Sequence, residues 1–526
     1  MLTVAGCKVE SVLGTARRRG DAGGIVERAA TQIQRVLGAS AAPSTNAQGV
    51  VIAIIDEVEM AAPKHLLFPV ETINRELDYR LALAVMAARQ DNRIYIGLHE
   101  TLMRVARRLR GGVYLGKNAI RPHASDALDD YHRLKERGFV FVHLDTEGAV
   151  YPGDAARWRK ILYQRLDPRH LDSEDYVCTW GDFQREAYRE LQPPCAANIR
   201  TTGHPRFDLY RPRWRSFYGD KAQKLRQRFG DFVLVNTNFT HANNKMGTDF
   251  VFSPINGFDS ADLESRLDTV RDWAYMNAQL SHFVRLVHRL QGEFPTLAIV
   301  VRPHPTESPD FYQRAFRDLS SVHVLHEGPV GPWLLACQCM IHDGCTTGVE
   351  AHLSQARIIN YRGVDDSTRD FFLPNLFGVQ CTSEDAVVAH LSDLLGQRHT
   401  EFASHKINDV DPRAQRLLNN FCAESFPMML EILDEAQNKV RRTDGPPAFA
   451  LHGEESLYET LEGAKNLLRP LSARHRHAAE YSRNKFPGLD SNDIKQRLQR
   501  LQRIADRRVT FRVVSRGLMV VESPND

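Results

Sequence analysis

The sequence predicts an α/β protein built from two parallel-sheet domains. Short apolar runs, typical of strands buried in a parallel sheet, alternate with segments of helical periodicity. This alternation occurs twice along the chain, which indicates two separate sheets. In the second series, two polar loops directly follow strand-like runs, and the carboxyl ends of strands are where open α/β sheets bind ligands.

At 526 residues, the chain is too long for a single hydrophobic core. Residues 1–49, which include a Gly/Ala/Ser-rich stretch, are predicted to form a poorly ordered extension. We expect an N-terminal domain in residues 50–213, a C-terminal domain in residues 214–411, and a helical segment with a basic tail in residues 412–526. The helices of this last segment are expected to pack back across both domains.

In the first domain, residues 50–55 are expected to form the first buried strand. The later strand-like runs, which are also apolar, are residues 94–97, 112–115, 139–144, 176–178 and 198–201. Helical spacing of apolar residues predicts helices near residues 75–89 and 100–109.

The second domain repeats this rhythm around one long helix, expected at residues 260–291. Its strand-like runs are residues 232–236, 297–301, 322–325, 340–341 and 358–361. Two such domains that face each other across a cleft would form a donor site mainly from the second domain and an acceptor site mainly from the first.

The overall composition is that of a soluble globular protein, with 42% hydrophobic and 25% charged residues and a net charge of +3. Residues 469–516 are locally basic, with thirteen Lys or Arg against four Asp or Glu. This tail could lie on anionic lipid or an acidic acceptor, or form a solvated helical face. Nucleic-acid binding is disfavoured, because the tail lacks interleaved aromatic residues and the rest of the chain is nearly neutral.

The eight cysteines show no metal-ligand spacing, which favours reduced thiols and a cytoplasmic location. No apolar run approaches the roughly 18 residues that span a bilayer. We therefore expect any membrane association to be peripheral.

The first polar loop contains Arg302 and His304, each followed by proline. The prolines end the strand of residues 297–301, so that both side chains should project at the carboxyl end of the sheet. The alternative is that His304 is an ordinary loop residue.

The second polar loop begins at His342 and leads into a helix over residues 348–353. Thr346 or Thr347 could cap this helix, and hydroxyls and backbone N–H groups at a positive helix end favour a phosphate. Glu350, about one turn further on, could accept hydrogen bonds from a ribose. The alternative is a plain helix cap. Because the two loops are expected at the ends of neighbouring strands, the combination indicates a nucleotide site.

Several segments together carry a family resemblance. They are Pro69-Val70-Glu71, Arg75-Glu76-Leu77-Asp78, Leu144-Asp145-Thr146-Glu147-Gly148, Gly203-His204-Pro205-Arg206-Phe207-Asp208, Asn236-Thr237-Asn238-Phe239, Arg302-Pro303-His304-Pro305 and Thr346-Thr347-Gly348-Val349-Glu350-Ala351. Over residues 50–489 the chain resembles the bacterial surface carbohydrate biosynthesis proteins, a GT-B-like glycosyltransferase group. This group includes the retaining 3-deoxy-manno-octulosonic acid (Kdo) transferases of capsule and lipopolysaccharide O-antigen assembly. Asp343 departs from the group, in which Asn is common at that position.

The resemblance implies two Rossmann-like domains that face a cleft and a CMP-activated ulosonic acid, such as CMP-Kdo, as donor. Two carboxylates at one anomeric centre suit a double displacement. Glu147 would be the general acid/base, or would instead cap a helix or pair with an arginine. The resemblance implies that Asp208 is the nucleophile; its alternative is a structural loop anchor.

The remaining expected roles concern the donor and the cleft. His304 would donate a hydrogen bond to the departing phosphate, Arg302 would pair with it or support the loop, and Thr346 and Thr347 would hold it. Glu71 and Arg75, with Asp343, are expected at the cleft; alternatively Glu71 and Arg75 form only a surface ion-pair ladder. This scheme requires no metal and no cofactor besides the nucleotide-sugar donor.

The sequence thus predicts a glycosyltransferase that passes an ulosonic acid to a glycan or glycolipid acceptor, in the cytoplasm with peripheral contact to the inner membrane. One alternative keeps the fold but changes the chemistry, to a UDP-sugar epimerase or a polyol-phosphate transferase of the teichoic-acid type. Another is a non-catalytic scaffold that recruits assembly enzymes to the membrane.

Overall fold

The computed structural model describes residues 43–45, 51–53, 64–89, 91–118, 120, 128–396, 407–440 and 485–524. The chain divides into two units, Met1–Ala62 and Pro63–Asp526. In the first unit, strands β1 (Pro43–Thr45) and β2 (Val51–Ala53) pair antiparallel with each other. The expectation that residues 50–55 open the large parallel sheet was therefore wrong. Most of the predicted extension, residues 1–49, lies outside the described residues.

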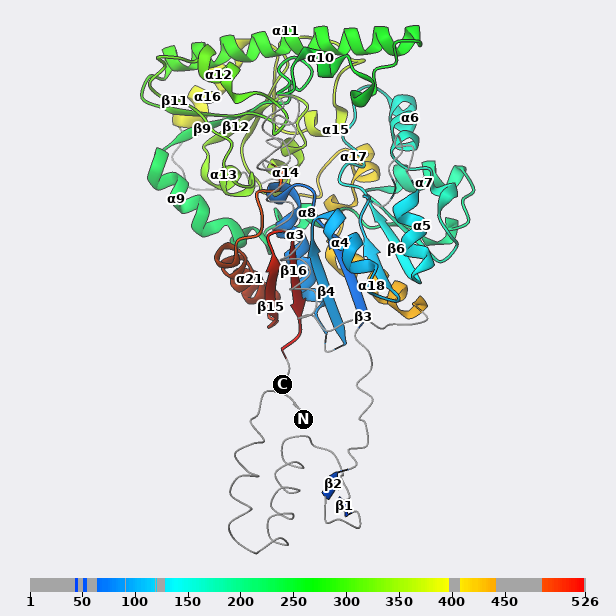
Figure 1. The fold of residues 1–526 in the computed structure, drawn as a ribbon. Helices are drawn as coiled ribbons and strands as arrows, with labels where there is room; N and C mark the ends of the chain where they lie inside the picture. Colours follow the sequence, from blue (N-terminus) through cyan, green and yellow to red (C-terminus); the bar gives the residue numbers. More distant parts are fainter. Residues whose placement is uncertain are drawn as a thin grey trace, which may run out of the picture. The chain divides into compact units, whose positions relative to one another are not determined.

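The second unit contains two sheets, and we call the parts built on them the first and the second lobe (Figure 1). The first-lobe sheet has the strand order β15-β16-β4-β3-β5-β6-β7-β8, and the strands from β4 to β8 pair in parallel. Its parallel strands are β3 (Lys64–Pro69), β4 (Asn92–Gly97), β5 (Gly112–Leu115), β6 (Phe139–Leu144), β7 (Tyr176–Thr179) and β8 (Ile199–Thr201).

Strand β3 opens this sheet, although its sequence is a weak strand signal. Leu66, Leu67 and Phe68 form its fully buried centre, but Lys64, His65 and Pro69 flank them, so that the apolar run is only three residues long. His65 is nevertheless 1% exposed, in a strand that lies in the interior of the sheet between β4 and β5. Tertiary burial has overridden a mixed local sequence.

The second-lobe sheet is parallel throughout, in the order β11-β10-β9-β12-β13-β14. Its strands are β9 (Phe232–Asn236), β10 (Ala298–Arg302), β11 (Val322–Val324), β12 (Cys339–His342), β13 (Ile358–Tyr361) and β14 (Val379–Cys381). This is the doubly wound order, which reverses direction between β9 and β12. The two polar loops were predicted to follow neighbouring strands. This was wrong, because β9 lies between β10 and β12.

Helices cover both sheets. The first-lobe helices are α3 (Asp78–Ala87), α4 (His99–Ala106), α5 (Asp129–Glu136), α6 (Ala155–Arg165), α7 (Asp182–Glu190) and α8 (Pro205–Asp208). The second-lobe helices are α9 (Gly219–Phe229), which packs on α13, α10 (Thr248–Val251), α11 (Leu263–Glu293), α12 (Pro309–Ala315), α13 (Gly331–Ala336), α14 (Thr347–Leu353), α15 (Phe372–Asn375) and α16 (Glu384–Gly396). The long helix α11 confirms the prediction for residues 260–291 to within a few residues. A π-helical turn, Ile73–Leu77, precedes α3.

The C-terminal segment adds helices α17 (Pro412–Leu417), α18 (Ser425–Lys439) and α21 (Ser491–Ala505). Helix α18 packs on α3, α8 and the first-lobe sheet, and α21 packs on α3. The segment was predicted to be helical throughout. This was wrong, because it ends in a hairpin of β15 (Thr510–Ser515) and β16 (Leu518–Glu522). Strand β16 pairs antiparallel with β4 and so extends the first-lobe sheet.

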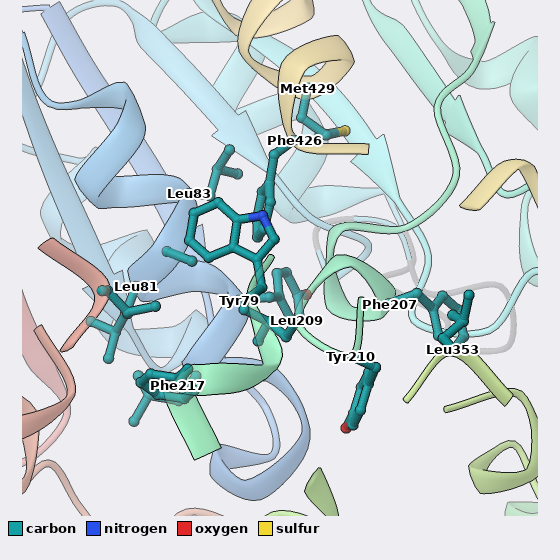
Figure 2. Close-up of a cluster of buried hydrophobic side chains, with 14 of the residues drawn as sticks. Tyr79, Leu81, Leu83, Phe207, Leu209, Tyr210, Phe217, Leu353, Phe426 and Met429 are labelled. Carbon is teal, nitrogen blue, oxygen red and sulfur yellow. The ribbon is translucent and has the colours of Figure 1, made fainter. Parts of the chain in front are cut away.

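One hydrophobic core runs through both lobes and α18 (Figure 2). Phe207 of α8, Phe426 and Met429 of α18, and Leu353 of α14 all belong to this cluster. The rings of Trp214 and Phe426 are 4.9 Å apart. Apolar burial therefore holds α8 between α18 and the second lobe.

Candidate functional site

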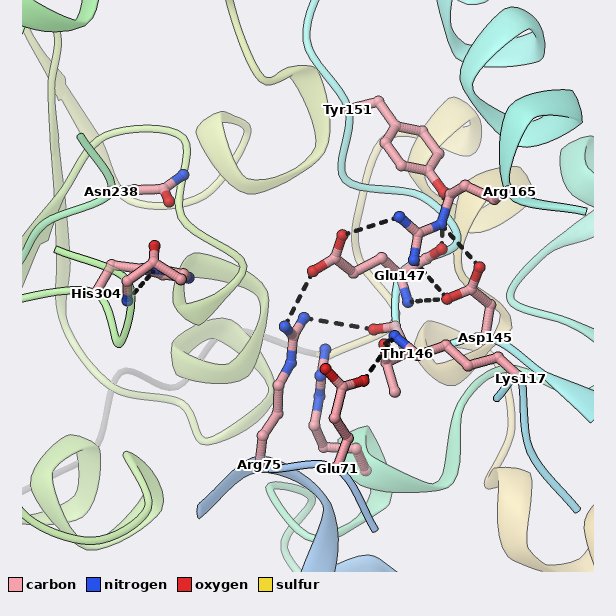
Figure 3. A network of polar contacts seen from close by, with 12 residues as sticks. Glu71, Arg75, Lys117, Asp145, Thr146, Glu147, Tyr151, Arg165, Asn238 and His304 are labelled. Atoms are coloured by element: carbon pink, nitrogen blue, oxygen red, sulfur yellow. Dashed lines mark hydrogen bonds and ion pairs between the residues drawn. The ribbon is translucent and has the colours of Figure 1, made fainter. Parts of the chain in front are cut away.

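The loop after β6 is fixed by hydrogen bonds before it reaches Glu147. Asp145 is 2% exposed, and its carboxylate accepts two hydrogen bonds from Arg165, at 2.8 Å from Nε and 2.6 Å from Nη2. The Trp180 indole donates to the Asp145 carbonyl at 2.9 Å, and the Glu147 N–H donates to Asp145 Oδ1 at 3.1 Å. These bonds present the Glu147 side chain at the carboxyl end of the first-lobe sheet (Figure 3).

Glu147 is surrounded by cations. Its Oε1 lies 3.0 Å from Arg75 Nη1, and its Oε2 lies 3.5 Å from Arg165 Nη1. Burial would raise the pKa of Glu147, but the charges of Arg75, Arg165 and Lys117 outweigh it and hold this pKa well below its usual range. The carboxylate is therefore ionised, and the arginine-pairing alternative holds in this structure. Its side chain is still 39% exposed, which leaves it accessible.

Glu71 and Arg75 have partners other than each other. Glu71 Oε1 lies 2.7 Å from Lys485 Nζ, its Oε2 lies 3.5 Å from Lys117 Nζ, and Arg75 pairs with Glu147. Burial opposes ionisation, yet the two lysines lower the pKa of Glu71 to about 2. The surface-ladder interpretation is therefore not supported, and both residues belong to the charged surface around Glu147 (Figure 3).

His304 follows β10 on the second lobe and is half-buried. Its Nδ1 accepts a hydrogen bond from the Thr306 backbone N–H at 3.3 Å and lies 2.8 Å from the Thr306 hydroxyl. Because a backbone N–H can only donate, we assign the ring proton to Nε2. Burial, followed by the charge of Arg75, lowers the pKa of His304 to about 3, so that the ring is a neutral donor.

His304 and the first-lobe charges lie near each other across the boundary between the lobes. Arg75 and Glu147 both influence the His304 pKa, in opposite directions. Figure 3 shows His304 and Asn238 on the second-lobe side, with Arg75 and Glu147 on the other side. We call this region, made by Glu71, Arg75, Lys117, Asp145, Glu147, Arg165, Asn238 and His304, the lobe interface.

The predicted helix cap is only partly present. Thr346 occupies the N-cap position of α14, but its side chain makes no capping hydrogen bond. Instead, the Thr347 hydroxyl accepts a hydrogen bond from Asn236 Nδ2 at 3.1 Å, which joins the end of β9 to the start of α14. These two ends flank the point where the strand order reverses. Helix α14 has seven residues, so its dipole alone is a weak anion site.

Gly348 allows α14 to pack closely on the sheet. A Cβ at this position would lie 2.4 Å from the His342 ring and 3.0 Å from the Pro374 carbonyl oxygen. Any side chain here would displace α14 and, with it, Thr346, Thr347 and Glu350.

Arg302 and Asp343 both make contacts that support nearby loops. The Arg302 guanidinium donates to the Glu327 carbonyl at 2.9 Å and also to the Gly328 carbonyl, and burial lowers its pKa to about 10. This is the loop-support alternative. Asp343 is 7% exposed and accepts from Gln279 Nε2 at 2.6 Å, while burial raises its pKa to about 6. It holds α11 against the loop after β12.

Asp208 makes the contacts of a loop anchor, the alternative to its predicted role as nucleophile. It is fully buried, and its two oxygens accept hydrogen bonds from Asn420 Nδ2 and the Phe426 N–H, each at 2.7 Å. Burial raises the Asp208 pKa to about 7. Gly203 completes the anchor, because its φ is +70° and a Cβ there would lie 2.4 Å from Asn420 Oδ1. The structure thus turns Asp208 towards α18 and does not join it with Glu147.

Glu350 lies in a buried pair that joins the lobes. Its Oε1 is 3.3 Å from Nε of Arg206, and the two side chains are 6% and 3% exposed. Burial raises the pKa of Glu350, although Arg206 and two further arginines, Arg75 and Arg302, act against it. Arg206 lies in one of the segments that carry the family resemblance, but no role was predicted for it. Lys117 and Arg165 were not predicted either, because they carry no local signal.

No group of three or more potential metal ligands occurs in the part of the chain that the structure describes. Among those same residues, no helix is both long enough and apolar enough to cross a membrane.

No protein-family model and no curated protein matches the chain. Solved structures similar to it include the wall teichoic acid polymerase TagF, with 11% identity over 72% of this chain and 90% of that chain and a TM-score of 0.39. The Neisseria meningitidis UDP-GlcNAc 2-epimerase bound to UDP-GlcNAc shows 10% identity over 71% of this chain and 100% of that chain, with a TM-score of 0.41. The Methanocaldococcus jannaschii UDP-GlcNAc 2-epimerase in complex with UDP-GlcNAc and UDP shows 9% identity over 70% of this chain and 99% of that chain, also with a TM-score of 0.41. The strand orders of the two lobe sheets confirm the predicted fold class, α/β with two Rossmann-like lobes.

Proposed function

We propose that the protein is a glycosyltransferase that acts on a nucleotide-activated sugar at the lobe interface. The observation that supports this most strongly is the pairing of a neutral imidazole donor, His304, with the ionised pair of Arg75 and Glu147 on the opposite lobe. A leaving phosphate needs donors and positive charge, and an acceptor hydroxyl needs a base. Groups that could meet both requirements, once a donor is bound, lie within one region.

The donor phosphate would lie against the second lobe, where the strand order reverses. Nε2–H of His304 would donate to a phosphate oxygen, and the Thr346 and Thr347 hydroxyls would position it. Arg75 can turn from Glu147 to the phosphate, because both partners are anions. Its charge would stabilise the negative charge that develops when the bond to the sugar breaks.

The same movement of Arg75 would prepare Glu147. While Arg75 and Arg165 hold its pKa low, this carboxylate is a weak base. When Arg75 moves from Glu147 to the phosphate, Glu147 loses one of its two arginine partners, and its pKa would rise. Glu147 would then remove the proton from the acceptor hydroxyl. Binding of the donor would thus activate the base.

Transfer of an ulosonic acid, with Kdo from CMP-Kdo as the specific case, rests on the segments that resemble the surface carbohydrate proteins. Arg75, Arg165, Lys117 and Lys485 at the lobe interface also suit a sugar that carries a carboxylate. The acceptor would be a glycan or glycolipid of a surface polysaccharide, reached through peripheral membrane contact. Retention through a covalent adduct on Asp208 would first require both of its hydrogen bonds to break.

The test is sugar transfer by wild-type protein and by His304→Ala, measured by mass spectrometry with CMP-Kdo and a glycan acceptor. We expect His304→Ala to stay folded and to lose about 100-fold or more in rate, because it removes a donor to the leaving group. His288→Ala, at an exposed histidine of α11, is the control and should retain the wild-type rate. Equal rates in all three proteins would refute the proposal.

Calorimetry with CMP, CMP-Kdo and UDP-GlcNAc separates the alternatives. CMP binding without UDP-GlcNAc binding is expected. Preference for UDP-GlcNAc would instead favour the UDP-sugar epimerase. Normal polysaccharide output in cells that carry His304→Ala would favour the non-catalytic scaffold.

A further inference from the structure

Arg206 is a buried arginine whose hydrogen-bonding capacity is unused. Its side chain is 3% exposed, and Nε, Nη1 and Nη2 have no hydrogen-bond partner among the described residues. A guanidinium offers five N–H donors, and buried donors without acceptors are costly. The faces of the guanidinium are covered, with its carbon 4.8 Å from the centre of the Phe207 ring and 5.6 Å from the Trp180 ring. Only the edge that carries the N–H groups is left for an acceptor.

The surroundings of Arg206 are over-supplied with positive charge. Glu350 is its nearest carboxylate, at 3.3 Å, but the contact lacks hydrogen-bond geometry. Arg302, and Arg75 whose direct partner is Glu147, also act on Glu350, so that three guanidinium groups lie within its electrostatic reach. Arg75 in turn repels Arg206. A further anion would relieve this imbalance.

The rest of the loop holds Arg206 in place. Asn420 accepts from the His204 N–H at 2.8 Å and donates to Asp208, whose other oxygen binds the Phe426 N–H. Both ends of helix α8 are therefore held by the C-terminal segment. His204, before the helix, binds Asn420, and Asp208, at its end, binds Asn420 and the first turn of α18. Such fixed positioning is what an anion receptor needs.

We propose that Arg206 is the receptor for an anionic group of the sugar donor, either its phosphate or the carboxylate of an acidic sugar. The anion replaces Glu350 as the partner of Arg206, and Glu350 is released to bind the ribose. In this structure the two receptors are therefore paired with each other across the lobes. The proposal rests on the proposed function and deepens it, because it names the group that recognises the donor's charge.

The test is calorimetry with four ligands, namely pyrophosphate, CMP, free Kdo and CMP-Kdo. Arg206→Met should weaken binding of at least one class of anion, phosphate or carboxylate, by about tenfold or more. This is the loss of affinity expected when a charge-assisted contact is removed. Glu350→Gln should tighten binding of pyrophosphate or Kdo, because it removes the competing carboxylate. Arg213→Met is the matched control: Arg213 also stacks on an aromatic ring, Trp214, and pairs with a glutamate, Glu424, but is 59% exposed.

The two sources of the anion give different results. If Arg206→Met loses binding of pyrophosphate and CMP but still binds Kdo, the anion is the phosphate. If it loses binding of Kdo and CMP-Kdo but still binds CMP, the anion is the carboxylate. Arg206-dependent binding of pyrophosphate or Kdo by a protein that binds no nucleotide would keep the inference and refute the proposed function. Unchanged affinities in Arg206→Met, weaker anion binding in Glu350→Gln, or no binding by the wild type would overturn the inference. Because Glu350→Gln predicts a gain, misfolding of Arg206→Met cannot imitate the expected pattern.

Discussion

The loops after β6 and β8 each supply one of the two carboxylates predicted to be catalytic, yet their environments are opposite. Glu147 is 39% exposed and lies between arginines, whereas Asp208 is fully buried and bound by Asn420 and the Phe426 N–H. Nearby cations hold the pKa of Glu147 far below its usual range. Burial raises that of Asp208 to about 7.

The comparison teaches that a position at the carboxyl end of a parallel sheet does not by itself make a catalytic residue. What covers that end decides the role. Helix α18 closes over the loop after β8, so that Asp208 holds the chain together. The loop after β6 faces the second lobe, so that Glu147 remains accessible.

The largest effect that should sharpen this contrast is that of Glu147→Gln on transfer. Loss of a general base should lower the rate by about 100- to 10,000-fold. The free energy of unfolding should change by less than about 1 kcal/mol, since the ion pair is partly exposed. Transfer assays and urea unfolding measure the two quantities. Glu186→Gln, at an exposed glutamate that pairs with Arg416, is the control and should change neither.

Asp208→Asn should show the opposite pattern. It replaces one buried acceptor with an N–H₂ group that faces a donor, which should lower the free energy of unfolding by about 1 to 3 kcal/mol. Donor binding should persist in the fraction that remains folded. A variant of wild-type stability that has lost transfer would break the comparison and restore Asp208 as the nucleophile.

The stability deficit of Asp208→Asn should also depend on pH. Because the folded pKa of Asp208, about 7, exceeds its usual value of 3.8, the folded protein binds more protons between these values. The contribution of this carboxyl to stability is thus present at low pH and lost as pH rises through 7. The deficit should therefore be larger at about pH 5 than at about pH 8. Urea unfolding at both pH values tests the sign, and a larger deficit at the higher pH would contradict it.

The smallest expected effect is that of Lys485→Met. This removes one of the two lysines that pair with Glu71, at a cost of less than about 1 kcal/mol in unfolding free energy. The pKa of Glu71, now about 2, should rise towards its usual value, which carboxyl NMR titration can follow. Lys495→Met, on α21, is the control. An unchanged Glu71 pKa would show that Lys117 alone sets it.

Strong local patterns were predicted correctly. The strands at Phe139–Leu144, Phe232–Asn236 and Ile358–Tyr361 have the boundaries that their apolar runs predicted. Strand β3 was missed because its apolar run is only three residues long, and residues 50–55 were misassigned because an apolar run does not specify its partner strand.

The sequence by itself indicated two parallel-sheet lobes and placed Glu147 and His304 just after strands and Thr347 at the start of a helix, because hydrophobic periodicity is a local property. Only the tertiary structure decided which charges meet. Arg75 and Glu147 are 72 residues apart in sequence, and Asp208 and Asn420 are 212 apart. The role of a carboxylate depends on its burial and on the cations around it, and both are set by how distant segments pack.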